Sequence, residues 1–192
     1  MINYKNMGLA PRIKNILGKN AAILALLSVL VAYFIFGSFH LTKFVTTDEQ
    51  YWLYDRIPKY WHGWSELNFK KTHINDKPGV SLAIISGPGL LFESDPENHI
   101  IRNDSGFDAY DTGYTERLYG FFRWPVFIFN GLFIFYLYWI IKKISNPSIA
   151  LISSALILLS PVLLGISRVV NPDAVLWSFS AAAACARFPA AA

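Results

Sequence analysis

The sequence predicts an all-α, polytopic membrane protein with a large extracytoplasmic first loop that carries juxtamembrane helices. Three observations predict this class. The chain is 54% hydrophobic and 16% charged, whereas soluble domains carry about 25% charged residues. Runs without any acid cover residues 21–41 and 118–141, and about 20 apolar residues suffice to cross a bilayer. All of the 13 acids except Asp173 lie between Asp48 and Glu116, which marks the polar loop.

Residues 1–20 form a basic tail, and residues 21–41 form the first membrane helix. Basic residues before an apolar run mark the cytoplasmic side of a membrane. A cleaved signal peptide is the alternative, but its apolar core covers only about 7–15 residues and ends in small residues. Here the run is longer and ends in Phe39-His40-Leu41. The tail has four scattered basic residues and no acid, so no nucleic-acid partner is predicted: Lys5, Arg12, Lys14 and Lys19.

Residues 42–117 form the extracytoplasmic loop. Thr46 with Glu49, and Thr47 with Gln50, each fit a capping box, which predicts a short amphipathic helix over about 48–57 that stops near Pro58. Aromatic side chains around it suit an aromatic belt at headgroup depth. Stacking of one or two of them on a sugar or prenyl chain is the alternative. These aromatic residues are Tyr51, Trp52, Tyr54, Tyr60, Trp61 and Trp64.

Residues 79–92 are apolar but short. At ~1.5 Å per residue they reach about 21 Å, less than the ~30 Å of a hydrocarbon core. Gly87-Pro88-Gly89 also interrupts them, so we expect an interfacial or re-entrant segment. The acid-rich residues 93–117 are expected to form a solvated loop, and their spacing fits no EF-hand.

Residues 118–141 form the second membrane helix, in which Arg123 can snorkel to the headgroups. Residues 148–166 form the third, and a further helix starts within 174–192. With 79–92 in the interface, Lys142-Lys143 faces the cytoplasm, as the positive-inside rule requires. If 79–92 crosses the membrane instead, these two lysines lie outside.

The preferred topology brings charged residues from three places to the outer face. A carboxylate can act as general base on an acceptor hydroxyl, and Lys or Arg can hold a leaving phosphate. Acids could also bind a divalent cation. The alternative is structural: acids stabilise a helix N-terminus through its dipole, or cap it. The candidates are Asp48, Glu49, Asp76, Lys77, Arg168 and Asp173.

These motifs resemble the N-terminal part of a GT-C glycosyltransferase, close to the protein O-mannosyltransferases and the lipid A aminoarabinose transferases. Thr47-Asp48-Glu49-Gln50-Tyr51 resembles the acidic pair after the first membrane helix. Asp76-Lys77-Pro78-Gly79-Val80 resembles the element that opens the next apolar segment, although Gly79 replaces the second proline of one form. The turn from Ser167 to Ala174 resembles the Arg…Asp element, and Arg117-Leu118 the start of the helix between them.

The resemblance implies transfer of a sugar from a polyprenyl-phosphate donor to an acceptor protein or glycolipid. Asp48 would be the base with Glu49 beside it, and Lys77, Arg168 and Asp173 would bind substrate. Asp76 would bind a divalent metal or the donor phosphate, and the resemblance implies no other cofactor. The protein would lie in a bacterial cytoplasmic membrane, with its N-terminus inside and its active face outside.

Such enzymes have about a dozen membrane helices, so the ending AAAACARFPAAA suggests a truncated and inactive fragment. The alternative is a non-enzymatic small membrane protein or accessory subunit. A transporter fragment is a third option, but it would need charged or broken helices at mid-membrane, which the second and third spans do not predict.

Overall fold

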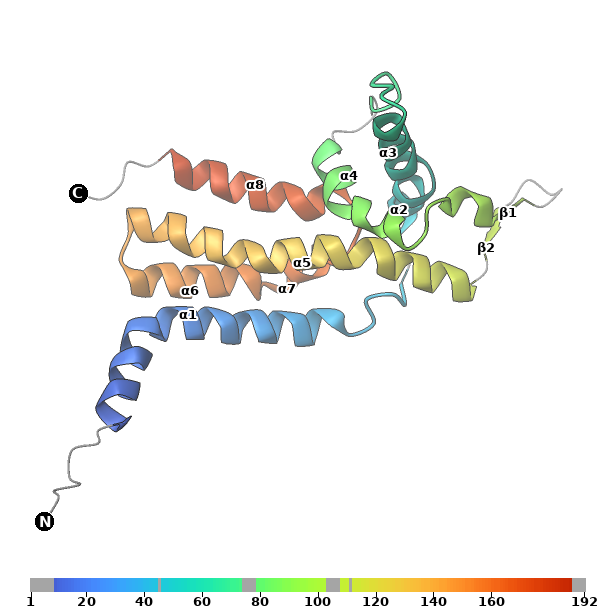
Figure 1. Ribbon diagram of the computed structural model, residues 1–192. Helices are drawn as coiled ribbons and strands as arrows, with labels where there is room; N and C mark the ends of the chain where they lie inside the picture. Colours follow the sequence, from blue (N-terminus) through green and yellow to red (C-terminus); the bar gives the residue numbers. More distant parts are fainter. Residues whose placement is uncertain (1–8, 45, 74–78, 103–107, 111, 188–192) are drawn as a thin grey trace, which may run out of the picture.

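The computed structural model describes residues 9–44, 46–73, 79–102, 108–110 and 112–187. Four helices run side by side as a bundle, and a short helix, α7, follows α6 (Figure 1). The all-α prediction is confirmed; within the described residues the strands β1 (Ile100–Arg102) and β2 (Asp108–Tyr110) form a single small antiparallel hairpin. The bundle consists of α1 (Leu9–Ser38), α5 (Thr112–Ile144), α6 (Pro147–Leu158) and α8 (Pro172–Ala186), with α7 at Pro161–Ile166.

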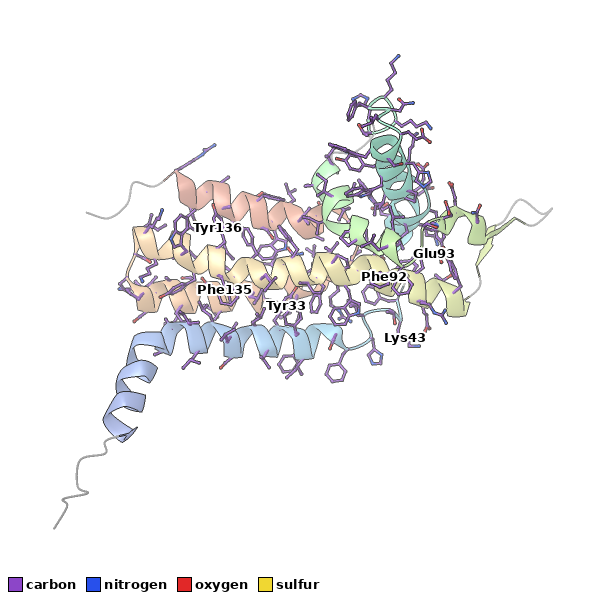
Figure 2. The ribbon with its side chains drawn as sticks, in the orientation of Figure 1. Tyr33, Lys43, Phe92, Glu93, Phe135 and Tyr136 are labelled. Carbon is purple, nitrogen blue, oxygen red and sulfur yellow. The ribbon has the colours of Figure 1, made fainter. Side chains whose placement is uncertain are left out.

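Two helices of the described chain are long and apolar enough to cross a membrane. They are Ala21–Ser38, with mean hydropathy 2.3, and Gly113–Ile144, with mean hydropathy 1.7. One side of α1 packs on α5, where Tyr33 stacks on Phe127 at 4.5 Å and donates a hydrogen bond to its carbonyl oxygen (Figure 2). The other side of α1 exposes Val31, Phe36 and further apolar side chains, as a lipid-facing helix would.

The ends of α1 differ from the predicted span 21–41. The described part of the helix starts at Leu9, and Pro11 falls in its first turn, where the missing proline N–H is not needed for helix hydrogen bonding. It ends at Ser38 rather than Leu41, and His40 then takes a left-handed conformation with φ 54°. Half of the predicted basic tail is therefore helical.

The chain after α1 is helical from Thr47 to Ser65, so the predicted stop at Pro58 is wrong. Its parts are α2 (Thr47–Tyr51), the π-helical turn η2 (Trp52–Arg56) and α3 (Ile57–Ser65). In the π turn the N–H of Ile57 donates to the carbonyl of Trp52, five residues back. This shift in hydrogen-bond register just before Pro58 lets the helix continue past a residue that cannot donate.

The predicted aromatic belt is wrong for half of its members. Trp52, Tyr54 and Tyr60 are buried in the core, and Tyr51, Trp61 and Trp64 are exposed. The Trp52 ring occupies the place where a side chain at residue 79 would lie, since an added Cβ there would be 1.8 Å from it. Packing against Trp52 therefore requires glycine at position 79, where one form of the family motif has its second proline.

The segment 79–92 forms the short helix α4 (Val80–Ser86) and the 3-10 turn η3 (Gly87–Leu91), which pack on α5, with α4 also contacting α3 and α8. After it come the turn η4 (Pro96–His99) and the β hairpin. Its position in the membrane interface stays a prediction.

The predicted third span, 148–166, is not one helix. It is divided between α6 and α7, because Ser160 has extended ψ (124°) and Pro161 begins a new helix. The residue before a proline is disfavoured in the helical region, and the proline itself cannot donate to the preceding turn. The 12 residues of α6 span only about 18 Å.

Both ends of the described chain and the α5–α6 connection lie at one end of the bundle, and α2, α3 and α4 lie at the other (Figure 1). Lys142 and Lys143 occupy the last turn of α5, at the same end as the start of α1. This arrangement agrees with the predicted separation of the basic residues from the loop.

Candidate functional site

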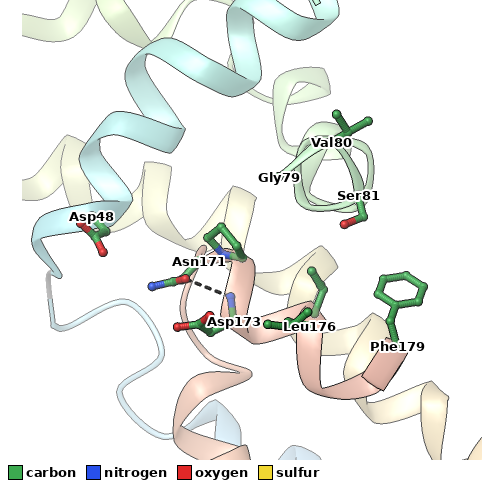
Figure 3. A pocket seen from close by; sticks show the side chains of 10 residues that line it. Asp48, Gly79, Val80, Ser81, Asn171, Asp173, Leu176 and Phe179 are labelled. Atoms are coloured by element: carbon green, nitrogen blue, oxygen red, sulfur yellow. Dashed lines mark hydrogen bonds between the residues drawn. The ribbon is translucent and has the colours of Figure 1, made fainter. Parts of the chain in front are cut away.

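A cleft of about 590 Å³ lies where the starts of α2, α4 and α8 meet (Figure 3). Asp48 lines it from α2, Val80 and Ser81 from α4, and Asp173 from α8. An adjoining hollow of about 340 Å³ shares Asp48, Asn171 and Asp173. We call the two together the acidic cleft. Two carboxylates from opposite halves of the chain therefore border one space.

Asn171 shapes the α8 side of the acidic cleft. It is the N-cap of α8, and its side-chain oxygen accepts a hydrogen bond of 3.0 Å from the Asp173 N–H. The alternative prediction, in which Asp173 itself caps the helix instead of binding substrate, is therefore wrong. Asp173 lies in the first turn with an exposed side chain. The N-cap role of Asn171 could have been predicted from the sequence, since Asn is a favoured N-cap residue and Pro is favoured at the first helical position that follows it.

Glu49 is the fully buried neighbour of Asp48. Arg123 donates to both of its oxygens, from Nε at 2.8 Å and from Nη2 at 2.5 Å. The Thr46 hydroxyl and the Val170 N–H donate to the same carboxylate at 2.8 and 2.7 Å. Successive helical residues point about 100° apart, so Asp48 can face the cleft while Glu49 faces the core.

Arg123 completes this buried ion pair, and its predicted snorkelling to the headgroups is wrong. The side chain is 0% exposed. It also donates to the carbonyl oxygens of Leu41 and Phe44, and its guanidinium lies over the rings of Phe44 and Tyr119 at 4.2 and 4.5 Å. A charge this deep is stable because every direction around it offers an acceptor or an aromatic face. We call the pair the Glu49–Arg123 clamp.

The clamp joins the linker after α1, the start of α2, the first half of α5 and the turn before α8. Those are the segments that carry the two sides of the acidic cleft. A catalytic role for Glu49 next to Asp48 stays a prediction. Its carboxylate already accepts four hydrogen bonds and does not line the cleft. The geometry suits a positioning role.

Arg168 lies beside the clamp rather than in the cleft. It is half-buried, donates to the Phe39 carbonyl oxygen and lies 5.3 Å from the Phe44 ring centre. Burial, and then the charge of Arg123, lower the pKa of Arg168 below its usual value. Its contacts fasten the turn before α8 to the end of α1.

Asp76 and Lys77, the remaining predicted site residues, lie outside the described residues. Gly79 and Val80, which directly follow that stretch, do line the acidic cleft. Within the part of the chain that is described, no three His, Cys, Asp or Glu side chains gather as a metal site. A divalent cation held by Asp76 stays a prediction.

The fold and the cleft define an all-α membrane protein with two carboxylates in a cleft at one end of its helix bundle. Residues 121–192 match the family model described as dolichyl-phosphate-mannose-protein mannosyltransferase. Over that part of the chain the match confirms the GT-C, mannosyltransferase-like resemblance, and it points to a glycosyltransferase. Neither the curated proteins nor the solved structures provide a match. The matched part contains Arg123 and Asp173, whereas Asp48 precedes it.

Proposed function

We propose that the chain forms part of the active site of a membrane glycosyltransferase. This enzyme moves a sugar from a polyprenyl-phosphate donor to a hydroxyl of a protein or glycolipid on the outer face of a bacterial cytoplasmic membrane. One observation carries the proposal: Asp48 shares a cleft with Asp173, and Asp173 belongs to the part that matches the mannosyltransferase family.

In the proposed reaction, Asp48 accepts the proton of the acceptor hydroxyl as the new bond to the sugar C1 forms. The bond between C1 and the phosphate oxygen breaks, and polyprenyl phosphate leaves with the bonding electrons. Asp48 suits this role better than Glu49, because its half-exposed side chain borders the cleft. Asp173 would orient the substrate from the opposite wall.

The carboxylates of Asp48 and Asp173 would repel the leaving phosphate, so the reaction needs a cation near that phosphate. We propose Lys77 for this, with Arg168 holding the turn that carries Asp173. Asp76 could hold a divalent cation, which would neutralise the phosphate charge. The N-terminus would be cytoplasmic, since α1 starts at the end of the bundle opposite to α2 and α4 (Figure 1), whose residues line the cleft.

The test uses a full-length protein that contains this chain, and compares Asp48→Asn with wild type in proteoliposomes that contain a radiolabelled polyprenyl-phosphate mannose and membrane acceptors. We expect Asp48→Asn to lose transfer by about 10²–10⁴-fold, the usual contribution of a general base, with an unchanged melting temperature. Asp55→Asn is the matched control, because Asp55 is an exposed acid of the same helical stretch. Unchanged turnover by Asp48→Asn would exclude Asp48 as the base.

Two alternatives have their own signatures. A full-length protein that contains this chain and transfers neither mannose nor aminoarabinose would favour a non-enzymatic membrane protein. A transporter would need the helix break between α6 and α7 to face a ligand, but neither Leu159 nor Ser160 lines the acidic cleft.

A further inference from the structure

A separate hollow of about 670 Å³ lies at the outer end of α3. We call it the basic aromatic hollow. It differs from the acidic cleft in its chemistry, since its described lining includes no carboxylate. The lining residues that matter here are Tyr60, Trp64, Phe69, Lys70, His73 and Val80.

The apolar part of this hollow is unusually open. Trp64 is 48% exposed and Phe69 is 59% exposed, and their rings meet edge to face at 5.6 Å. Beside them Leu67 is 74% exposed and has φ 55°. A left-handed leucine is strained, and Leu67 combines this strain with an exposed apolar side chain just after α3 ends.

The charges around the hollow are basic. The stretch 56–73 contains Arg56, Lys59, Lys70 and Lys71, and Glu66 is its one acid. Lys71 donates to Glu66 at 2.5 Å, so these two charges offset each other. Lys70 and His73 are left to line the hollow. This contrasts with the acid-rich remainder of the loop.

The position of α3 suits contact with a membrane surface. In Figure 1, α3 runs roughly perpendicular to the bundle helices and projects sideways from the bundle. A bilayer that surrounds the bundle would therefore meet α3 near its headgroups. Exposed Trp and Leu with flanking Lys are typical of helices that lie in an interface, and clustered basic residues favour anionic lipids.

We propose that the basic aromatic hollow binds the phosphate headgroup of an anionic phospholipid from the surrounding bilayer. Lys70 and His73 contact the phosphate, and Trp64, Leu67 and Phe69 rest against the glycerol and upper acyl region. Val80 lines both this hollow and the acidic cleft. The bound lipid would thus lie next to the acidic cleft, whatever reaction occurs there.

The experiment measures which lipid gathers around Trp64. The full chain is reconstituted in two sets of nanodiscs that contain phosphatidylglycerol and phosphatidylcholine at the same ratio. Brominated acyl chains, which quench tryptophan fluorescence, are carried by phosphatidylglycerol in one set and by phosphatidylcholine in the other. The Trp64 signal is the difference between each protein and its Trp64→Phe variant.

We expect brominated phosphatidylglycerol to quench Trp64 more strongly than brominated phosphatidylcholine at equal mole fraction. Lys70→Gln should weaken the preference about fivefold, since each basic residue near an anionic surface contributes about 1 kcal/mol. Lys70→Arg should keep it. Lys71→Gln is the matched control, because it removes the same charge from the neighbouring residue, which is paired with Glu66 and does not line the hollow.

Four results would overturn the proposal. Equal quenching by the two lipids in the wild type would mean that the hollow has no anionic preference. An unchanged preference in Lys70→Gln would place the lipid elsewhere, as would an equal loss in Lys71→Gln. Abolition of the preference by excess inorganic phosphate would show that free phosphate, and not lipid, is the occupant. No glycosyl transfer is measured, so failure here leaves the proposed function unaffected.

Discussion

Replacing Arg123 by methionine tests how much the Glu49–Arg123 clamp stabilises the fold. Methionine preserves most of the apolar stem and removes the guanidinium, which donates to the Glu49 carboxylate and to the carbonyls of Leu41 and Phe44. Among the described residues, the Glu49 carboxylate would keep the Thr46 hydroxyl and the Val170 N–H as its donors. Breaking a buried ion pair in this way costs about 3–5 kcal/mol.

The assay is reversible unfolding in mixed detergent micelles, followed by tryptophan fluorescence. Arg117→Met is the matched control, because Arg117 is an exposed arginine on the same helix. It should change the free energy of unfolding by less than about 0.5 kcal/mol, as is usual for surface substitutions. The wild type, Arg123→Met, Glu49→Leu and the double variant complete a double-mutant cycle.

The double variant should be less destabilised than the sum of its two single variants, with a coupling of about 0.5–3 kcal/mol. This follows because the single variants each leave one charge buried without its partner, and the double variant leaves none. Strict additivity, or a loss below about 1 kcal/mol for Arg123→Met, would refute the structural role of the clamp.

Three further substitutions test packing, capping and a polar contact in the bundle, each by its melting temperature or unfolding free energy. Gly79→Ala should destabilise the protein by about 1–3 kcal/mol through overpacking, because the new Cβ would lie 1.8 Å from the Trp52 ring. Adding Trp52→Phe to the same chain should recover part of that loss. A wild-type melting temperature for Gly79→Ala would contradict the contact. Asn171→Ala should cost about 1 kcal/mol by removing the α8 cap, whereas Asn171→Asp should be tolerated; equal losses would argue against capping. Ser178→Ala removes a 2.7 Å hydrogen bond to Asn130 and should cost only about 0.6 kcal/mol, the average for such bonds between membrane helices; a loss of several kcal/mol would show that the pair organises the bundle.

The all-α fold class could be predicted from local sequence, because a long apolar run without acids indicates a membrane helix by itself. The ends of the helices could not. Pro11 and Pro58 are both tolerated inside helical stretches, one in a first turn and one behind a π turn, whereas Pro161 divides a helix. The same residue type has three outcomes, and the hydrogen-bond register of its neighbours decides between them.

The acidic pair could be found from the sequence, but the division of roles within it could not. Burial of Glu49 depends on Arg123, 74 residues later in the chain, and no local pattern links the two. Arg123 looked like a snorkelling residue because its place near a helix end is typical of one. The proximity of Asp173 to Asp48 could be predicted, since the preferred topology puts both at the outer face, and both line the acidic cleft.

The clamp also constrains the order in which the protein can assemble. Glu49 leaves the ribosome long before Arg123, and the Val170 N–H that completes its hydrogen bonding follows Glu49 by 121 residues. At synthesis rates of about 5–20 residues per second, that interval is roughly 6–24 s. During it the glutamate has to stay hydrated, so the cleft beside Asp48 takes its final form only when the turn before α8 is in place.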